Sequence, residues 1–268
     1  MAATTHRAPS GTRDILPPES QRWTALLELF EREAVLAGYG LVLTPLFEDL
    51  SLFSRGVGES TDIVAKEMYE FEDKGGRALA LRPEFTASVV RAFIQHRPAT
   101  PWKVWYWGPN FRYERPQAGR YRQFFQLGAE ALGTADPALD VEMVALAWRL
   151  IESLRLTRVT CLLNTLGDAN CRPQYRAKLI AYVSEHEHEL CPEHQARWRQ
   201  NPLRVLDCKK EPCRRATQDA PLQLDHLCDE CADHWKRVRD GLDTVGIPYQ
   251  VEPRLVRGLD YYTRTTFE

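Results

Sequence analysis

The stretch GPNFRYERPQAGRYRQFFQLGAE, residues 108–130, predicts two strands joined by a tight polar turn. Residues 104–113 and 121–132 carry aromatic and aliphatic side chains that favour half-buried strands, and Pro116 and Gly119 mark the turn between them. One carboxylate, Glu114, is surrounded by four arginines: Arg112, Arg115, Arg120 and Arg122. Because a guanidinium group binds phosphate oxygens through two parallel hydrogen bonds, this hairpin suits a polyanion such as a nucleotide. The alternative is a solvated, charged hairpin at a sheet edge.

Two stretches of the chain resemble a known family. F-R-x-E, a short loop and R-x-x-x-F resemble motif 2 of the class II aminoacyl-tRNA synthetases, and the longer string FRYERPQAGRYRQF is similar to the histidyl-tRNA synthetases in particular. Residues 255–268, LVRGLDYYTRTTFE, look like the histidine-specific signature of the same family. The alternative for this second stretch is a strand pair around a packed tyrosine corner.

Composition narrows the class of protein. A chain of 268 residues with 44% apolar content can bury one large domain, or one domain with an insertion. The net charge of -2 shows that the chain is not basic overall, so any contact with nucleic acid is expected at local basic patches. No apolar run approaches the roughly 18–20 residues of a membrane span, and the first residues lack the apolar core of a signal peptide. Seven cysteines do not suggest a secreted disulfide framework, so we expect a cytoplasmic protein without a membrane partner.

Apolar periodicity predicts an α+β fold, in which helices back a mainly antiparallel sheet. A helix with Trp23 and Phe30 on one face ends near Gly38, and residues 68–72 and 78–82 form a hairpin. Further helices are expected after Thr86 and from Asp136, and strands at 41–44 and 159–163. The expected domains are a catalytic core at 1–167, a mostly helical insertion at 168–245 and a return to the core at 246–268.

The expected insertion contains most of the cysteines. Cys208-x4-Cys213 and Cys228-x2-Cys231 are pairs that could together hold a structural zinc ion, with Cys191 and His194 nearby in sequence. Unligated cytosolic thiols are the alternative, and we assign no metal ligand from the sequence.

The resemblance implies a histidine--tRNA ligase, a class II enzyme of protein biosynthesis. Such an enzyme joins histidine to ATP as histidyl-adenylate and then transfers the histidyl group to tRNA(His). ATP would enter with Mg2+, and the family forms homodimers. Neither G-x-x-x-x-G-K-[ST] nor G-x-G-x-x-G occurs in the chain, so a P-loop or a Rossmann turn does not bind the nucleotide.

The resemblance also implies an ATP-binding set and two catalytic arginines. Arg112 would contact the α-phosphate and Glu114 the adenine amino group, while Phe124 stacks on the base and Arg120 completes the set. Arg257 would act from the opposite side of the α-phosphate, near the histidine carboxylate, where it does work that a metal ion does in other families. In the loop, Arg115 and Gln117 would meet the acceptor end of the tRNA.

The histidine-binding residues follow from the same resemblance. Glu84, Thr86 and Gln126 would hold the ammonium group. A neutral imidazole presents one donor and one acceptor, which Glu130 and Tyr262 would match, with Tyr261 beside them. For Glu84 alone, the alternative is a favourable charge in the first turn of a helix.

The chain departs from the family pattern at two phenylalanines. Phe85 replaces a glycine of P-E-G-T, which affects the shape of the pocket. Phe125 replaces a histidine of R-Q-F-H-Q, and we expect its side chain to point to the back of the sheet.

The alternative function is that of a non-charging paralogue such as the regulatory subunit of ATP phosphoribosyltransferase. The family's glycine-rich strand, its motif 3 arginine and its anticodon-binding domain have no counterpart in these 268 residues, so we expect a catalytic fragment.

Overall fold

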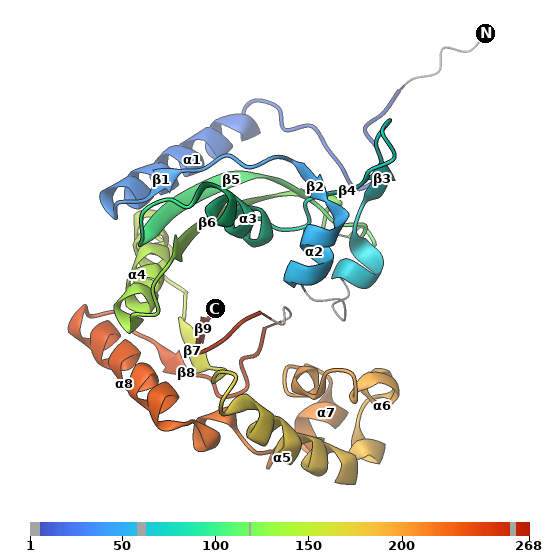
Figure 1. The fold of residues 1–268 in the computed structure, drawn as a ribbon, viewed down its shortest axis with the longest axis vertical. Coiled ribbons are helices and arrows are strands. Elements are labelled where there is room, and N and C mark those ends of the chain that lie inside the picture. The colour runs from blue at the N-terminus through green and yellow to red at the C-terminus, as the bar shows by residue number, and fades with distance from the viewer. Residues whose placement is uncertain (1–5, 58–62, 118, 258–260) are drawn as a thin grey trace. The chain divides into compact units, whose positions relative to one another are not determined.

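The arginine-rich hairpin forms the longest strand pair of the computed structural model (Figure 1), which describes residues 6–57, 63–117, 119–257 and 261–268. β5 (Trp102–Phe111) and β6 (Gln123–Leu132) are antiparallel over ten residue pairs, as the sequence predicted. β1 (Gly40–Leu41) lies parallel to β5 on its other edge. Gly128 is required in this pairing, because a Cβ atom there would lie 2.4 Å from the Tyr106 side chain.

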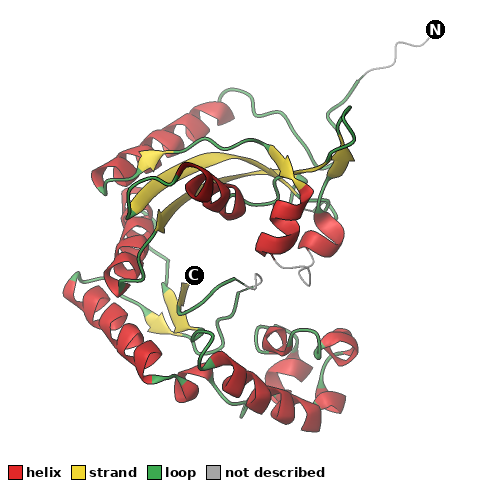
Figure 2. Cartoon of the chain, viewed as in Figure 1, coloured by secondary structure: helices red, strands yellow, loops and turns green. Residues whose placement is uncertain are grey.

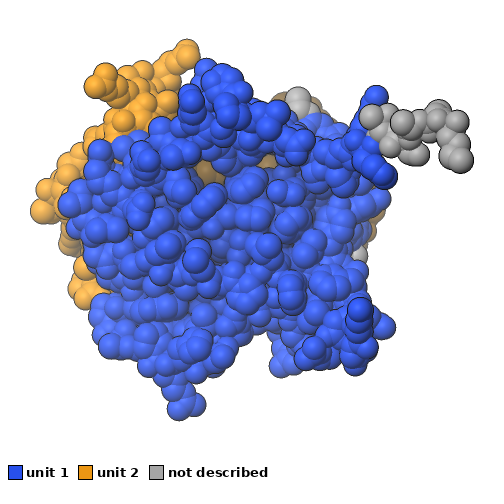
Figure 3. Space-filling view, turned by 90° about the horizontal axis from the view of Figure 1, so that it is seen from above, with its two compact units in different colours: residues 1–134 blue, residues 135–268 orange. Residues whose placement is uncertain are grey.

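Contacts divide the chain into two units, Met1–Thr134 and Ala135–Glu268, which Figure 3 distinguishes by colour. The first unit has a second small sheet in which β4 (Ala78–Leu81) lies between β2 (Phe47–Asp49) and β3 (Glu70–Glu72). Both pairings are antiparallel, which confirms the hairpin expected at 68–82. This unit also contains α2 (Leu50–Val57) and a π-helix, η1 (Ile63–Glu67).

Two longer helices pack on opposite faces of the β5–β6 hairpin. From α1 (Glu19–Leu36), Trp23 meets Phe125 and Phe30 meets Trp105, with ring centroids 4.9 and 5.8 Å apart. α3 (Thr86–His96) packs against the other face through an apolar cluster that includes Val89, Val104 and Tyr106. Successive side chains of a strand point to opposite faces, so the two helices contact alternate residues of the same two strands. Figure 2 shows the same helices in red beside the yellow strands.

The second unit begins with a helix and a third small sheet. α4 (Pro137–Ser153) is capped by Asp136, whose carboxylate accepts the Ala138 N–H at 3.0 Å, and it packs on α8 (Asp229–Thr244). β7 (Leu162–Thr165) pairs in parallel with β8 (Gln250–Val251) and antiparallel with β9 (Thr265–Phe267). The returning chain thus completes the sheet that β7 begins.

Short helices fill the remainder of this unit. They are α5 (Arg172–Glu185), η2 (Glu187–Glu189), α6 (Pro192–Arg197), η3 (Pro202–Val205), α7 (Glu211–Ala216) and η4 (Gln223–His226). Tyr175, Leu179 and Trp198 lie at the centre of their apolar cluster.

The cysteine pairs do not meet in one place, contrary to a single four-cysteine site. Cys208 and Cys213 lie in one group with Cys191 and His194, while Cys228 and Cys231 lie in another with Asp168 and Cys171. Cys213 is in α7 and Cys231 is in α8, and their additional neighbours come from the start of α6 in one group and from the segment before α5 in the other. Sequence spacing alone does not determine such a pairing.

The α+β class is confirmed, with four antiparallel and two parallel strand pairings among the described residues. Two predicted strand positions were inaccurate. The strand predicted at 41–44 is β1, which ends at Leu41, and the strand predicted at 159–163 is β7, which begins only at Leu162. The division into domains at 167 and 245 stays a prediction. In the described residues, no helix is both long enough and apolar enough to cross a membrane.

Candidate active site

A buried carboxylate occupies the start of α3. The Glu84 side chain accepts the backbone N–H of Thr86 at 2.7 Å through one oxygen and that of Ala87 at 2.8 Å through the other. Only 5% of Glu84 is exposed. Burial raises the pKa of Glu84, and the two backbone hydrogen bonds and the charge of Arg112 oppose that rise. Glu84 lies just before the N-cap residue Phe85 rather than in the first turn of α3, and it stabilises the helix start by accepting these two N–H groups while presenting a desolvated carboxylate.

A second carboxylate, Glu130 on β6, lies beside the first. One of its oxygens accepts the Thr86 hydroxyl at 2.7 Å and the Tyr106 hydroxyl at 3.2 Å. Burial raises the pKa of Glu130, and the negative charge of Glu84 raises it further. Among the described residues, neither glutamate forms an ion pair with a lysine, an arginine or a histidine. Two desolvated carboxylates without a cation partner suit a ligand that brings positive charge and N–H donors.

Gln126 is held by a residue that the sequence analysis missed. The Asn110 side-chain amide donates to the Gln126 side-chain oxygen, and Asn110 is fully buried. The Asn110 oxygen has no hydrogen-bond partner in the described part of the chain. Tyr106 was missed as well. Both residues are on β5 at alternate positions, so the period-2 pattern of a strand was the signal that could have found them.

Arg112 and Phe124 lie together near the start of α3. Arg112 Nε donates to the Pro83 carbonyl oxygen at 3.0 Å, and its guanidinium carbon lies 5.0 Å from the centroid of the Phe124 ring. An arginine held over an aromatic face keeps its charge while its geometry is restricted. The structure thus brings the two residues predicted for the α-phosphate and the adenine into contact.

The turn between the strands contains the remaining residues of the hairpin set. Glu114 and Arg120 form an ion pair at 3.4 Å, and the Arg120 side chain is 66% exposed. Gln117 and Arg120 exchange backbone hydrogen bonds, with N to O distances of 3.3 and 2.9 Å. Arg115 and Gln117 are both exposed.

The two phenylalanines that depart from the family pattern lie on opposite faces of the hairpin. Phe85 is buried and stacks on Tyr106, with ring centroids 4.2 Å apart and planes at 12°. It therefore supports Tyr106, whose hydroxyl donates to Glu130. Phe125 packs on Trp23 of α1, which confirms that its side chain points to the back of the sheet.

Arg82 is a further buried charge close to Phe85. It donates to the carbonyl oxygens of Pro109 at 2.9 Å and Thr44 at 3.1 Å, and its guanidinium carbon is 3.8 Å from the Phe85 ring centroid. Burial lowers its pKa to about 10. These contacts tie β5 to the chain that enters β2.

A largely apolar cavity in this unit lies chiefly on the α1 side of the hairpin, with Gln126 among its lining residues. It has a volume of about 410 Å³ and is lined largely by α1 and the back of the hairpin, including Trp23, Leu27, Trp107 and Phe125. It contains no carboxylate, so chemistry rather than cavity volume identifies Glu84 and Glu130 as the candidate site.

In the second unit, the residues predicted from the histidine-specific signature contact one another. The Arg257 guanidinium carbon lies 5.3 Å from the Tyr262 ring centroid, and Arg257 forms an ion pair with Glu268 at 3.4 Å. Tyr261 and Tyr262 stack with ring centroids 5.0 Å apart. Arg172 donates to the Tyr262 carbonyl oxygen. Residues 258–260 of the signature lie outside the described residues.

An antiparallel hairpin that presents Arg112 and Glu114, next to a helix that begins with a buried glutamate, defines the class of protein: the fold is that of a class II aminoacyl-tRNA synthetase catalytic domain. The particular family follows from comparison with known proteins. Residues 11–268 match the family model described as histidyl-tRNA synthetase, and the chain belongs to that family.

Relatives agree with this assignment over nearly the whole chain. The histidine--tRNA ligase of Halothermothrix orenii is 52% identical over 98% of this chain and 63% of its own length. That of Corynebacterium kroppenstedtii is 53% identical over 97% of this chain and 62% of its own. This chain therefore spans less than two thirds of these curated relatives.

Solved structures show the same fold. The apo histidyl-tRNA synthetase of S. aureus is 36% identical, with a TM-score of 0.77, and 98% of this chain corresponds to 61% of that one. A Bacillus halodurans structure described as an ATP phosphoribosyltransferase regulatory subunit/histidyl-tRNA synthetase has a TM-score of 0.68 at 21% identity, over 98% of this chain and 72% of that one. At that identity the second likeness concerns the fold alone.

Proposed function

We propose that this chain is the catalytic portion of a histidine--tRNA ligase. In the first step the histidine carboxylate attacks the α-phosphorus of ATP, and pyrophosphate leaves. In the second step a ribose hydroxyl at the 3' end of tRNA(His) attacks the histidyl carbonyl, and AMP leaves. ATP enters as its Mg2+ complex. Family membership supports this assignment, since the relatives at about 50% identity are named histidine--tRNA ligases.

One observation within this chain carries the proposal: the desolvated pair of Glu84 and Glu130, joined through Thr86. The histidine ammonium group would supply the cation that Glu84 lacks, and an imidazole N–H would donate to Glu130. A substrate without these donors would leave buried carboxylates unpaired, which costs enough to discriminate strongly among amino acids. The side-chain oxygen of Gln126, held by Asn110, would accept a hydrogen bond from the ammonium group.

The nucleotide would bind along the hairpin. Arg112 would stabilise the negative charge that grows on the α-phosphate, and its contacts to Pro83 and Phe124 hold it ready for that role. Phe124 would stack on the adenine. Glu114 would accept from the adenine amino group, and Arg120, which now pairs with Glu114, would turn to the phosphates.

We assign the residues of the second unit to the same substrates. Arg257 would be the second catalytic arginine, acting on the α-phosphate and the histidine carboxylate. Tyr262 would contact an imidazole nitrogen of the substrate, as the resemblance implies, and Tyr261 stacks on Tyr262. We further assign Arg115 and Gln117 to the tRNA acceptor end, and infer a cytoplasmic homodimer, as the family implies.

Histidine-dependent exchange of pyrophosphate into ATP tests the proposal directly. We expect exchange with histidine and with none of the other nineteen amino acids. Exchange with a different amino acid would contradict the pocket assignment. Histidine binding without exchange would instead favour a non-charging paralogue.

Substitutions in residues 255–268 test separately the proposed roles of Arg257 in the chemical step and of Tyr262 in histidine binding. Arg257→Ala should abolish exchange in a folded chain, and retention of more than about a tenth of the rate, a loss below roughly 1.4 kcal/mol, would remove Arg257 from the chemistry. Tyr262→Phe should raise the KM for histidine much more than the KM for ATP. Equal effects on both would argue against an imidazole contact.

A further inference from the structure

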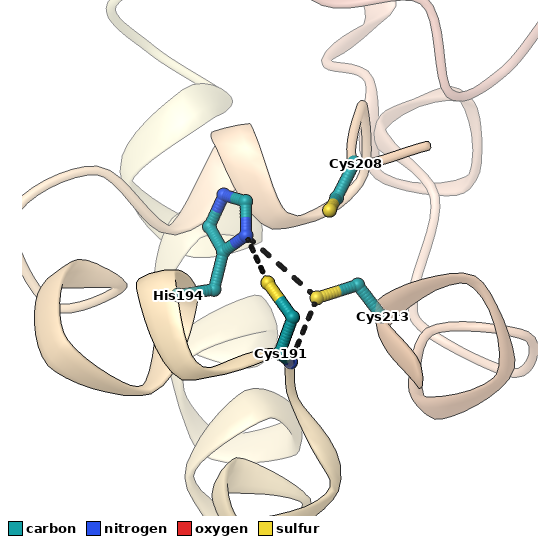
Figure 4. Close-up of side chains that lie close together, drawn as sticks. All are labelled: Cys191, His194, Cys208 and Cys213. Atoms are coloured by element: carbon teal, nitrogen blue, oxygen red, sulfur yellow. Dashed lines mark hydrogen bonds between the residues drawn. The ribbon is translucent and has the colours of Figure 1, made fainter. Parts of the chain in front are cut away.

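Four potential metal ligands converge among the short helices of the second unit (Figure 4). Cys191 directly precedes α6, His194 is within it, Cys208 follows η3, and Cys213 is in α7. One ligand atom from each residue lies within 4.8 Å of all the others. Cys191 and Cys213 are buried, and Cys208 and His194 are half-buried.

Two of the distances between these atoms are close to the edges of a tetrahedral zinc site. His194 Nδ1 lies 3.2 Å from Cys191 Sγ and 3.7 Å from Cys213 Sγ. Zinc binds thiolate sulfur at about 2.3 Å and imidazole nitrogen at about 2.0 Å, so the edges of such a tetrahedron are roughly 3.5–3.8 Å. The ligands are therefore already near the separations that one ion requires.

The sequence spacing and the surroundings agree with this geometry. Cys191-x2-His194 and Cys208-x4-Cys213 both fall within the usual separations of zinc ligand pairs. The Cys191 N–H points at Cys213 Sγ, at 3.3 Å, as backbone amides do toward a ligating thiolate. Lys210 lies between the second pair in sequence and forms an ion pair with Glu193 of α6 at 3.0 Å, which links α6 to the chain before α7.

A structural role is indicated by the elements that the four residues connect. α6 and α7 have six residues each and η3 has four, and helices of this length are not stable alone. They are held by the apolar cluster around Trp198, to which Cys191 and Cys213 belong. A bound zinc ion would fix the ends of three short helices at one point, and its binding energy would add to their stability.

We propose that Cys191, His194, Cys208 and Cys213 bind one structural Zn2+ ion, through three thiolates and His194 Nδ1. Each thiol loses its proton to solvent when the ion binds. This assignment divides the cysteines differently from a site built on Cys208, Cys213, Cys228 and Cys231. It is independent of the ligase activity.

The second group serves as a comparison rather than as part of the proposal. Asp168, Cys171, Cys228 and Cys231 also have ligand atoms within 4.8 Å of one another. The Asp168 carboxylate there is already paired with Arg264 at 3.4 Å and accepts the Asn170 N–H at 2.9 Å. Zinc bound at the first group is therefore measured as the difference in zinc content between the unmodified chain and a variant that lacks one of its four ligands.

Metal analysis of variants makes that count. The purified chain is loaded with zinc, dialysed exhaustively and analysed by mass spectrometry for metal per chain. We expect Cys213→Ser to hold one equivalent less than the unmodified chain. Cys161→Ser is the matched control, because Cys161 is buried and belongs to neither group. It should keep the full zinc content.

His194 provides a test that does not depend on losing the fold. His194→Ala should lose one equivalent of zinc, whereas His194→Cys should keep it, because a thiolate can replace the imidazole. X-ray absorption of the Cys231→Ser variant should show three sulfur ligands and one nitrogen ligand. An unmodified chain without bound zinc would overturn the proposal, and so would a Cys213→Ser variant with undiminished zinc.

Discussion

The two faces of the β5–β6 hairpin differ in what holds their side chains. On one face Glu130, Gln126 and Tyr106 are positioned by hydrogen bonds to one another, to Thr86 and to Asn110. The opposite face is held by aromatic contacts with α1, such as Trp23 with Phe125. Adjacent residues of β6 therefore have different tasks, because a strand turns each successive side chain to the other face.

The two faces of the hairpin also differ in what they contribute to the stability of the fold. Each aromatic pair on the α1 face contributes about 0.5–1.5 kcal/mol beyond the area that it buries. The face that carries Glu130, Gln126 and Tyr106 is called the pocket face. Burial raises the pKa of Glu130 on this face and of Glu84 beside it, so ionised carboxylates are held there at a cost in stability. Groups that a protein needs for binding commonly destabilise its fold in this way. The aromatic contacts between α1 and the other face of the hairpin compensate for that loss of stability.

The largest expected effect is a loss of histidine affinity caused by a substitution at Glu84. Glu84→Gln keeps the size of the side chain but removes the charge that would pair with the histidine ammonium group. We expect histidine binding, measured by calorimetry, to weaken by about 100-fold, or about 2.7 kcal/mol. ATP binding should change by less than about threefold, which is small beside the loss for histidine.

The control for this substitution is Glu31→Gln, on an exposed part of α1. It removes the same charge at a distance from the pocket and should leave histidine binding unchanged. Equal losses of histidine and ATP affinity in Glu84→Gln would show that the capping role of Glu84 at α3 dominates.

A pair of neighbouring substitutions compares the two faces directly. Phe124→Leu should weaken ATP binding by about fivefold, since it removes an aromatic contact worth about 1 kcal/mol. Phe125→Leu should leave ATP binding unchanged and lower the melting temperature by a few degrees, because it loses its contact with Trp23. Titration with ATP and thermal unfolding of both variants test this, and the same loss of ATP affinity in both would contradict the assignment of faces.

The smallest expected effect concerns stability and pH. Burial raises the pKa of Glu130 above its ordinary value of 4.5. The folded state then binds the proton more tightly than the unfolded state, so the stability that the protonated carboxyl contributes is fully present below pH 4.5 and is lost as the pH rises through the raised pKa. Glu130→Gln cannot ionise, and its amide oxygen can still accept from Thr86 and Tyr106.

We therefore expect the melting temperature of Glu130→Gln, relative to the unmodified chain, to rise between pH 4.5 and pH 8. Thermal unfolding in a series of buffers measures the difference, and Glu31→Gln gives the baseline for the loss of one carboxylate. A difference that falls with pH would mean that Glu130 is stabilised as the anion in the folded chain.

Much of the first unit was predictable from the sequence. The aromatic and aliphatic residues of 104–113 and 121–132 predicted both strands, whereas the roles that the motifs imply for Arg112, Glu114 and Glu84 stay predictions. The sequence analysis missed Tyr106 and Asn110, because each acts through a partner on another element. Their partners are set by the strand register, which pairs Tyr106 with Gly128 and Asn110 with Phe124.

The sequence by itself determined the α+β class, the central hairpin and the resemblance of two stretches to the histidyl-tRNA synthetases, because these depend on local periodicity and on contiguous motifs. Only the tertiary structure decided that Thr86 links Glu84 to Glu130, and that Cys208 and Cys213 meet Cys191 and His194 rather than Cys228 and Cys231. The physical reason is that a ligand set or a carboxylate pair depends on side chains from separate elements, whose proximity is fixed by packing and register.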